Sequence, residues 1–349
     1  MSMSRFLPRA AVAALLFAGL SQPAAAEKIR VGLINTGSDI GVLIADKKGY
    51  FKAEGLEVEV TSFTTAAKMI APLGAGQLDV GGGTVAAGIY NAVARDIGIR
   101  IVADKGSIKP GYNFSSLIVR KDHIDSGRYK SFKDLKGMKV AIAAYGTGNA
   151  ATLNAALEKG GLQWNEVDAV EMGFPQHVAG MTTKALDASI TNEPLASLAI
   201  SRGIAVRAPL DETIYPDHQV AALLYSTAFA KNQPEAAQKF MRAYLKGVRD
   251  YNDGLANGRI AGPNADEVIR ILTTSTEVKD AAIYLNTTPA AIDPDGKVSL
   301  ESLERDLAFF KKHKWVESAN MKAADIVDMS FAEKAARELG PYKPRQAAR

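Results

Sequence analysis

One stretch near the start of the chain constrains the fold more than any other. Residues 29–34 form an apolar run that predicts a short buried strand, and residues 40–48 carry apolar side chains at helical spacing. Gly49 stands where a helix ends in a left-handed residue, and residues 57–60 alternate polar and apolar as a strand with one wet face does. Together these residues predict a β-α-β unit, the opening element of an α/β sheet.

The first 26 residues have the pattern of an export signal. Arg5 and Arg9 supply a positive start, residues 10–20 form an apolar core, and residues 24–26 offer a small-residue cleavage site. This apolar core is too short to span a bilayer, which needs about 20 residues. We therefore expect a mature chain that begins near Glu27 and works in the periplasm.

The composition narrows the class of protein. The chain has 349 residues and no cysteine, which excludes thiolate metal sites and a thiol nucleophile. The length beyond the signal exceeds what one core usually holds, so we expect two lobes. Without Arg5 and Arg9, the 42 basic residues fall to 40 against 38 acidic ones. That balance argues against nucleic acid or a membrane surface as a partner.

Strands and helices alternate through most of the chain, which predicts open sheets of parallel strands. Residues 115–120 and 220–225 are predicted to be strands that cross between the lobes, so the expected fold is an α/β two-lobed clamshell hinged at two crossing strands. Helices from residue 234 onward are expected to pack on the first lobe. The predicted parts are a signal peptide (1–26), lobe 1 (27–117 with 224–349) and lobe 2 (118–223).

Several short motifs, in their order and spacing, resemble those of one protein family. Residues 48–58 read Lys-Gly-Tyr-Phe-Lys-Ala-Glu-Gly-Leu-Glu-Val, and residues 73–81, 135–140 and 157–162 carry shorter matches, as do 186–194. These motifs are similar to those of the periplasmic solute-binding proteins of nitrate, sulfonate and taurine ABC importers, a group that includes thiamine-pyrimidine binders. The resemblance covers about residues 29–250. It implies a clamshell fold, a small solute as ligand, a monomer, and a permease with separate ATPase subunits as partner.

Ligands of open α/β sheets bind where strands end and helices begin. Four such loops are predicted, and in the resembling family the same loops line the cleft. Glycines let backbone amides approach a ligand, and free amides at a helix start favour an anion. The predicted ligand-binding residues are Thr36, Gly37, Ser38 and Asp39; Gly83 and Thr84; Tyr145, Gly146, Thr147, Gly148 and Asn149; and Asn192 and Glu193.

The same residues have a simpler interpretation as helix caps. Ser, Thr, Asp and Asn are the usual N-caps, and Pro194 suits the first position of a helix. The recurrence of glycine beside Thr or Ser in both lobes is what favours a ligand site over caps alone.

The charges of these loops bear on the class of ligand. The loops contain no Arg or Lys, and only His177 comes near, whereas a dianion is usually held by a bidentate Arg. Asp39 and Glu193 are available to meet an amine. The sequence therefore favours a small organic anion or zwitterion, taurine-like or heterocyclic, over a simple inorganic anion. Aromatic residues near strand ends that would stack on a ring, or else belong to the lobe cores, are Tyr112, Phe114, Tyr145 and Phe174.

The sequence fits other functions less well than that of a carrier. Residues 146–151 match the dinucleotide fingerprint G-x-G-x-x-A, but an exported protein is not normally supplied with nicotinamide cofactors, so no cofactor is expected. The four histidines show no metal-ligand spacing, and no nucleophile elbow or phosphate loop occurs. Two alternatives remain: the ligand-binding module of a periplasmic sensor, and an enzyme on the same fold using Asp39 or Glu193 with His177. His123 and His218 are expected at the surface.

Overall fold

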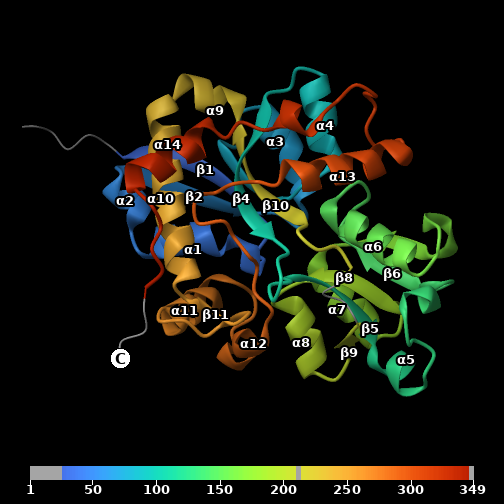
Figure 1. The fold of residues 1–349 in the computed structure, drawn as a ribbon. Coiled ribbons are helices and arrows are strands. Elements are labelled where there is room, and N and C mark those ends of the chain that lie inside the picture. Colours follow the sequence, from blue (N-terminus) through green and yellow to red (C-terminus); the bar gives the residue numbers. More distant parts are fainter. Residues whose placement is uncertain (1–25, 210–213, 346–349) are drawn as a thin grey trace, which may run out of the picture.

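The computed structural model describes residues 26–209 and 214–345, which form two lobes lying side by side (Figure 1). Each lobe is built around its own five-stranded sheet, so the predicted α/β two-lobed fold is confirmed. The predicted signal peptide falls, except for its last residue, outside the described residues. Within the two described ranges, every helix falls short of the length and apolar character that a membrane span requires.

The first sheet has the strand order β2-β1-β3-β10-β4. Strands β1, β2 and β3 are parallel, because a helical crossover connects each to the next. Strand β10 runs antiparallel to β3 and β4, since the chain re-enters this lobe at the edge where the other strands end. The sheet is therefore mixed and not purely parallel as expected. Its strands are β1 (Glu27–Leu33), β2 (Leu56–Ser62), β3 (Val80–Thr84), β4 (Ile99–Ser107) and β10 (Gln219–Ser226); its helices are α1 (Ile40–Lys47), α2 (Tyr50–Ala53), α3 (Ile70–Gly74) and α4 (Ala87–Ala94).

The second sheet repeats this design with the order β7-β6-β8-β5-β9. Strands β6, β7 and β8 are parallel, and β5 runs antiparallel to both β8 and β9. Its strands are β5 (Ser115–Arg120), β6 (Lys139–Ile142), β7 (Asp168–Glu171), β8 (Ala188–Asn192) and β9 (Ala205–Arg207); its helices are α5 (Lys121–Asp125), α6 (Gly148–Lys159), α7 (Phe174–Thr182) and α8 (Leu195–Ser201).

The chain changes lobes in the segments before β5 and β10. Strand β5 belongs wholly to the second sheet and β10 wholly to the first, so neither strand is itself the crossing that the sequence predicted. The predicted limits at 117/118 and 223/224 consequently fall inside these two strands. The apolar pattern identified both strands correctly, but it carries no information on the partner with which a strand pairs.

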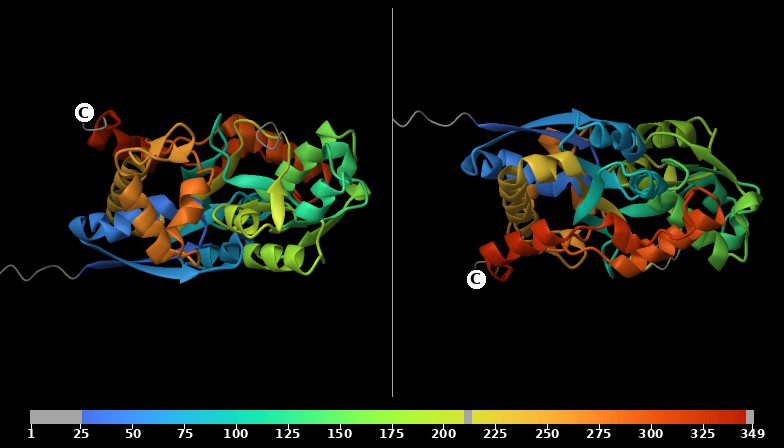
Figure 2. Two further views of the ribbon diagram at one scale, coloured as in Figure 1. Left: turned by 90° about the horizontal axis from the view of Figure 1, so that it is seen from below. Right: turned by 90° about the horizontal axis from the view of Figure 1, so that it is seen from above.

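The C-terminal helices pack on the first lobe, as predicted, but they also reach the second. Helix α10 lies so close to α1 that a Cβ on Gly247 would stand 2.2 Å from the carbonyl oxygen of Gly41. Helix α12 contacts α8, and α13 contacts α6. In the view from above, the red segment that follows residue 300 runs along both lobes (Figure 2). The elements are α9 (Thr227–Asn232), α10 (Pro234–Asn252), β11 (Leu255–Ala256), β12 (Arg259–Ile260), α11 (Ala265–Ser275), α12 (Ala281–Asn286), α13 (Leu300–Lys312) and α14 (Ser330–Leu339).

Candidate functional site

The four predicted loops meet at the seam between the two lobes. The amide of Gly37 in lobe 1 donates to the carbonyl of Glu193 in lobe 2 at 2.9 Å. A second pair of bonds joins the loop after β3 to the loop after β6: Ala87 N donates to Gly146 O at 2.7 Å and Gly148 N to Val85 O at 3.0 Å. The lobes therefore touch along the edges at which the parallel strands end, which is where open α/β sheets bind ligands.

The lobe 1 side of the seam is a buried polar cluster. Thr36, Ser38 and Asp39 are each at most 2% exposed. The Asp39 carboxylate accepts from the Thr36 amide at 2.9 Å, and the Thr36 and Ser38 hydroxyls lie 3.0 Å apart. These bonds form the capping box of the short turn Gly37–Asp39 before α1, with Thr36 as its N-cap, whereas the Asp39 side chain makes no capping bond to α1, the helix it was expected to cap. Capping uses one carboxylate oxygen, and the other faces a cation.

That cation is Lys105, which the sequence analysis missed. Its Nζ lies 2.6 Å from Asp39 Oδ1 and donates to Ser38 Oγ at 2.9 Å, and its side chain is fully buried. The apolar run at the start of this strand ends at Ala103 in the sequence, whereas β4 continues to Ser107 and carries Lys105 to the seam. Gly82 on β3, which β10 separates from β4, gives the space, because a Cβ there would stand 2.7 Å from Lys105 Cε.

The lobe 2 side of the seam is organised by Asn149. This residue at the start of α6 is fully buried, and its Nδ2 donates to Ser115 Oγ at 3.0 Å and Asn192 Oδ1 at 3.3 Å. Its Oδ1 lies 3.5 Å from Thr84 Oγ1 of the first lobe. A carboxamide with two donors and two acceptor lone pairs thus links three strands and both lobes. Ser115, the first residue of β5, was not among the predicted site residues.

Glu193 is already paired within its own lobe. Its carboxylate accepts from the Ser197 amide and hydroxyl at 3.0 Å each, and from Arg207 Nη2 at 2.7 Å. Since Asp39 is likewise paired with Lys105, neither carboxylate is placed to receive an amine without giving up a partner. The predicted loops themselves contain no Arg or Lys, but Lys105 of β4 and Arg207 of β9 bring cations to their carboxylates.

The two ends of the loop from Tyr145 to Asn149 have different surroundings: Thr147 lies at the start of α6, and Tyr145 lies among aromatic rings. Thr147 Oγ1 accepts from Ala150 N at 3.4 Å and so caps α6, while its backbone lies against Ala86 of the first lobe. Tyr145 is 43% exposed, and its hydroxyl donates to Ala169 O at 2.7 Å. The ring of Tyr145 lies against Trp164 and Trp315 rather than the buried polar groups.

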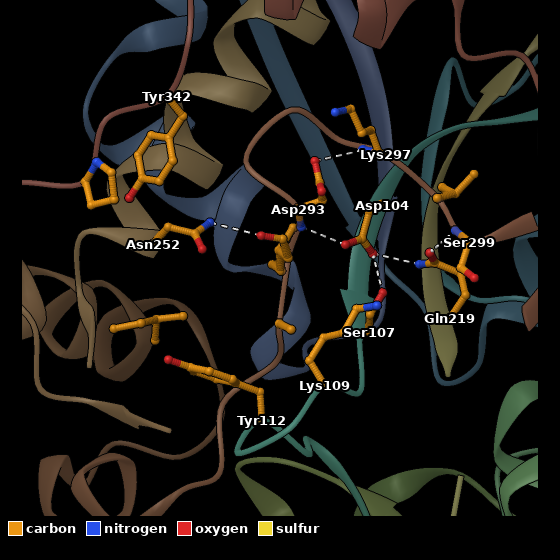
Figure 3. Close-up of a pocket in the computed structure, with 15 residues that line it drawn as sticks. Asp104, Ser107, Lys109, Tyr112, Gln219, Asn252, Asp293, Lys297, Ser299 and Tyr342 are labelled. Atoms are coloured by element: carbon orange, nitrogen blue, oxygen red, sulfur yellow. Dashed lines mark hydrogen bonds between the residues drawn. The ribbon is translucent and has the colours of Figure 1, made fainter. Parts of the chain in front are cut away.

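Cavities lie along the seam and next to the segments in which the chain changes lobes. A cavity of about 180 Å³ has walls from both lobes, with Thr36 and Phe63 on one side and Phe174 and Gln176 on the other. A second, of about 580 Å³, lies beside the hinge and contains Asp104 (Figure 3).

The Asp104 carboxylate joins β4, β10 and the C-terminal part of the chain by hydrogen bonds. It accepts from Gln219 Nε2 at 2.6 Å, Ser107 Oγ at 3.1 Å and the Asp293 amide at 2.8 Å. Burial nevertheless raises the pKa of Asp104 to about 6.

His123, His177 and His218 are buried and hydrogen-bonded within the fold. His177 is fully buried, with hydrogen bonds to Met172 O and Ser189 Oγ, and burial lowers its pKa to about 4. It therefore forms no acid–base pair with the carboxylates of the seam. His123 and His218, expected at the surface, are both buried and pair with Asp187 and Asp306. Among the described residues, no group of His, Asp or Glu has the arrangement of a metal site.

Comparison with known proteins identifies the family. Residues 22–261 match the sequence profile of the NMT1-like family, which is more than half of the chain. The chain belongs to the NMT1-like family. A relative within reach of sequence comparison is a protein of Brucella abortus strain 2308, named a binding protein, with 27% identity over 237 residues. The match covers 64% of this chain and 66% of the relative, so the chain spans just under two thirds of that protein's length.

Solved structures place this NMT1-like protein in the periplasmic binding-protein fold. The alkanesulfonate-binding protein SsuA from Xanthomonas axonopodis pv. citri, bound to MOPS, superposes with a TM-score of 0.68 at 17% identity, over 87% of this chain and 99% of that one. The periplasmic nitrate-binding protein NrtA from Synechocystis PCC 6803 gives 0.72 at 15% identity, over 89% of each chain. The resemblance to nitrate and sulfonate binders expected from the sequence is thereby confirmed.

Proposed function

We propose that this chain is the extracytoplasmic substrate-binding protein of an ABC importer, which captures a small organic anion or zwitterion between its lobes and delivers it to a permease. The observation that carries the proposal is the buried polar seam. A surface that only held two lobes together would be expected to be apolar, because burying polar groups is costly unless each is paired. Here both lobes contribute buried hydroxyls, amides and charges: Thr36, Ser38, Asp39, Lys105, Thr84, Ser115, Asn149 and Asn192.

The closed arrangement suggests how a solute would bind. Gly37 N, Ala87 N and Gly148 N each donate to a carbonyl of the opposite lobe. A solute that entered between the lobes would take over such bonds, and its contacts to both lobes would exist only when the cleft is shut. Binding would then shift an open–closed equilibrium towards the closed state, which is the form that a permease recognises in this mechanism.

The charges of the seam favour a ligand of small net charge. Lys105 brings a buried cation, and Asp39 brings the matching carboxylate. A zwitterion such as taurine offers a sulfonate to Lys105 and an ammonium to Asp39, so that each charge regains a partner. Phe63 and Phe174, on opposite lobes at the cavity of about 180 Å³, add apolar surface for the carbon skeleton or ring of the solute.

Thermal unfolding of the chain from Glu27, measured against a solute panel, tests the proposal. The panel holds taurine, alkyl and aromatic sulfonates, nitrate, aromatic carboxylates and the thiamine pyrimidine. A solute at 100 times its dissociation constant stabilises by about 2.7 kcal/mol, which raises the midpoint by roughly 5 °C for a chain of this size. Nitrate alone raising the midpoint would contradict the ligand class, and turnover of a bound solute would contradict the carrier function.

A further inference from the structure

Aromatic rings cross the seam beside the polar site. Tyr145 and Trp164 belong to lobe 2, and Phe309, His313 and Trp315 belong to the end of α13 and the residues after it; we call these five the aromatic cluster. Ring centroids are 5.5 Å apart for Trp164 and Phe309, 5.6 Å for Trp164 and Trp315, and 5.7 Å for Tyr145 and Trp315. The cluster therefore joins the lobes through contacts between aromatic rings.

The C-terminal half of the cluster is fixed to the first lobe. Asn91 of α4 donates through Nδ2 to Trp315 O at 2.8 Å, and its Oδ1 accepts from Glu317 N at 3.0 Å. Arg95, the C-cap residue of that helix, forms an ion pair with Glu317. Trp315 is thus held to α4, whereas Trp164 belongs to the second lobe, so lobe opening must separate the two rings.

The cluster also supports the lobe 2 loop of the polar site. Gly146 has a φ of +62°, and a Cβ there would stand 3.4 Å from Trp315 Cβ and 2.9 Å from Ala87 Cβ. Trp315 therefore packs directly on the loop that carries Thr147 and Asn149. A residue of the first lobe braces a solute-binding loop of the second.

We propose that the aromatic cluster is a closure contact that sets the affinity of the cleft for its solute without touching the solute. This inference rests on the proposed function. Contacts made only in the closed state raise the closed fraction of the free protein, and the apparent dissociation constant is the intrinsic one divided by that fraction. Tyr145, Trp164 and Trp315 are positioning residues in this scheme, and Tyr145 is not a contact of the solute.

The first test needs no solute. Because the chain has no cysteine, Lys52→Cys on lobe 1 and Lys133→Cys on lobe 2, both exposed, take a pair of spin labels without competing thiols. In the free protein, Trp164→Ala is expected to move the label distance distribution to longer values. An unchanged distribution would overturn the proposal.

The control separates closure from general loss of packing. Phe331→Ala removes a ring contact of 5.3 Å to Tyr225 that lies within lobe 1, and it should leave the label distances as in the parent. A shift in this variant equal to that in Trp164→Ala would show that any loosening opens the lobes, and would also overturn the proposal.

The second test measures affinity for several solutes. Trp164→Ala should weaken every solute by the same factor, about tenfold, because it changes the closed fraction and no solute contact. Trp164→Phe, which keeps a ring, should recover most of the affinity. A change in the ratio of affinities between solutes would contradict the closure mechanism. If no solute binds the parent, the proposed function fails, while the label distances still decide the role of the cluster.

Discussion

At the scale of single residues, the ion pair of Lys105 with Asp39 organises the lobe 1 side of the seam. The two charges lie 2.6 Å apart and are at most 1% exposed, and Asp39 also fixes the turn that carries Thr36. Such a pair is weak evidence for stability in itself, since its desolvation offsets much of the attraction. Losing one partner is a different matter, because the remaining charge stays buried without compensation.

Lys105→Met is therefore expected to lower the free energy of unfolding by about 3–5 kcal/mol, measured by urea unfolding. Adding Asp39→Asn, which keeps an acceptor for the Thr36 amide, should restore part of the loss. Lys28→Met breaks an exposed pair with Glu59, which solvent screens, and should leave the free energy of unfolding nearly unchanged. Strictly additive losses for Lys105→Met and Asp39→Asn would contradict the pairing.

The raised pKa of Asp104 predicts a pH dependence. The folded protein holds this proton up to pH about 6, whereas the unfolded chain releases it near the ordinary aspartate pKa of 3.8. Between these values the folded state binds more protons, so the stability that Asp104 contributes is present at pH 4 and is lost as pH rises through 6. The difference in unfolding free energy between the parent and Asp104→Asn should therefore be more favourable to the parent at pH 4 than at pH 7. A flat or opposite trend would contradict the assignment.

At the scale of elements, the sequence predicted most helices and strands because their apolar periods are strong. The helix predicted at 40–48 is α1 (Ile40–Lys47), the strand predicted at 115–120 is β5, and Gly49 has the expected left-handed φ of 72°. The sequence could not predict which strands pair with one another, since a buried strand such as β10 has the same apolar pattern in either sheet. Lys105 was missed for a related reason: polar residues at the end of a strand have the sequence pattern of a loop.

The contact of α1 with α10 depends on two glycines. A Cβ on Gly247 would stand 2.2 Å from the backbone oxygen of Gly41, and backbone gives way less readily than a side chain. Gly247→Ala should therefore destabilise the protein by roughly 1–3 kcal/mol, although alanine is the better helix former. Chemical denaturation measures the change. Glu235→Ala, at an exposed position of the same helix, should stay within about 0.5 kcal/mol of the parent, and equal effects would contradict the packing.

At the scale of the whole molecule, the C-terminal part connects the lobes as well as covering the first. One apolar cluster contains Val140 of lobe 2, Ile101 of lobe 1 and Leu307 of α13. The resemblance to binding proteins ended near residue 250, and nothing in the later sequence indicated contact with lobe 2. The predicted loops did come together at the seam, because the carboxyl ends of parallel strands share one edge. Their role as solute contacts remains a prediction.

A calorimetric titration tests the central claim most directly. The solute that gives the largest thermal shift is titrated into the parent, into Asn149→Leu and into Asn154→Leu, a change on the same helix at a residue bonded to Glu158. We predict one solute per chain, an affinity at least tenfold weaker in Asn149→Leu, and parental affinity in Asn154→Leu. Parental affinity in Asn149→Leu would contradict binding between the lobes.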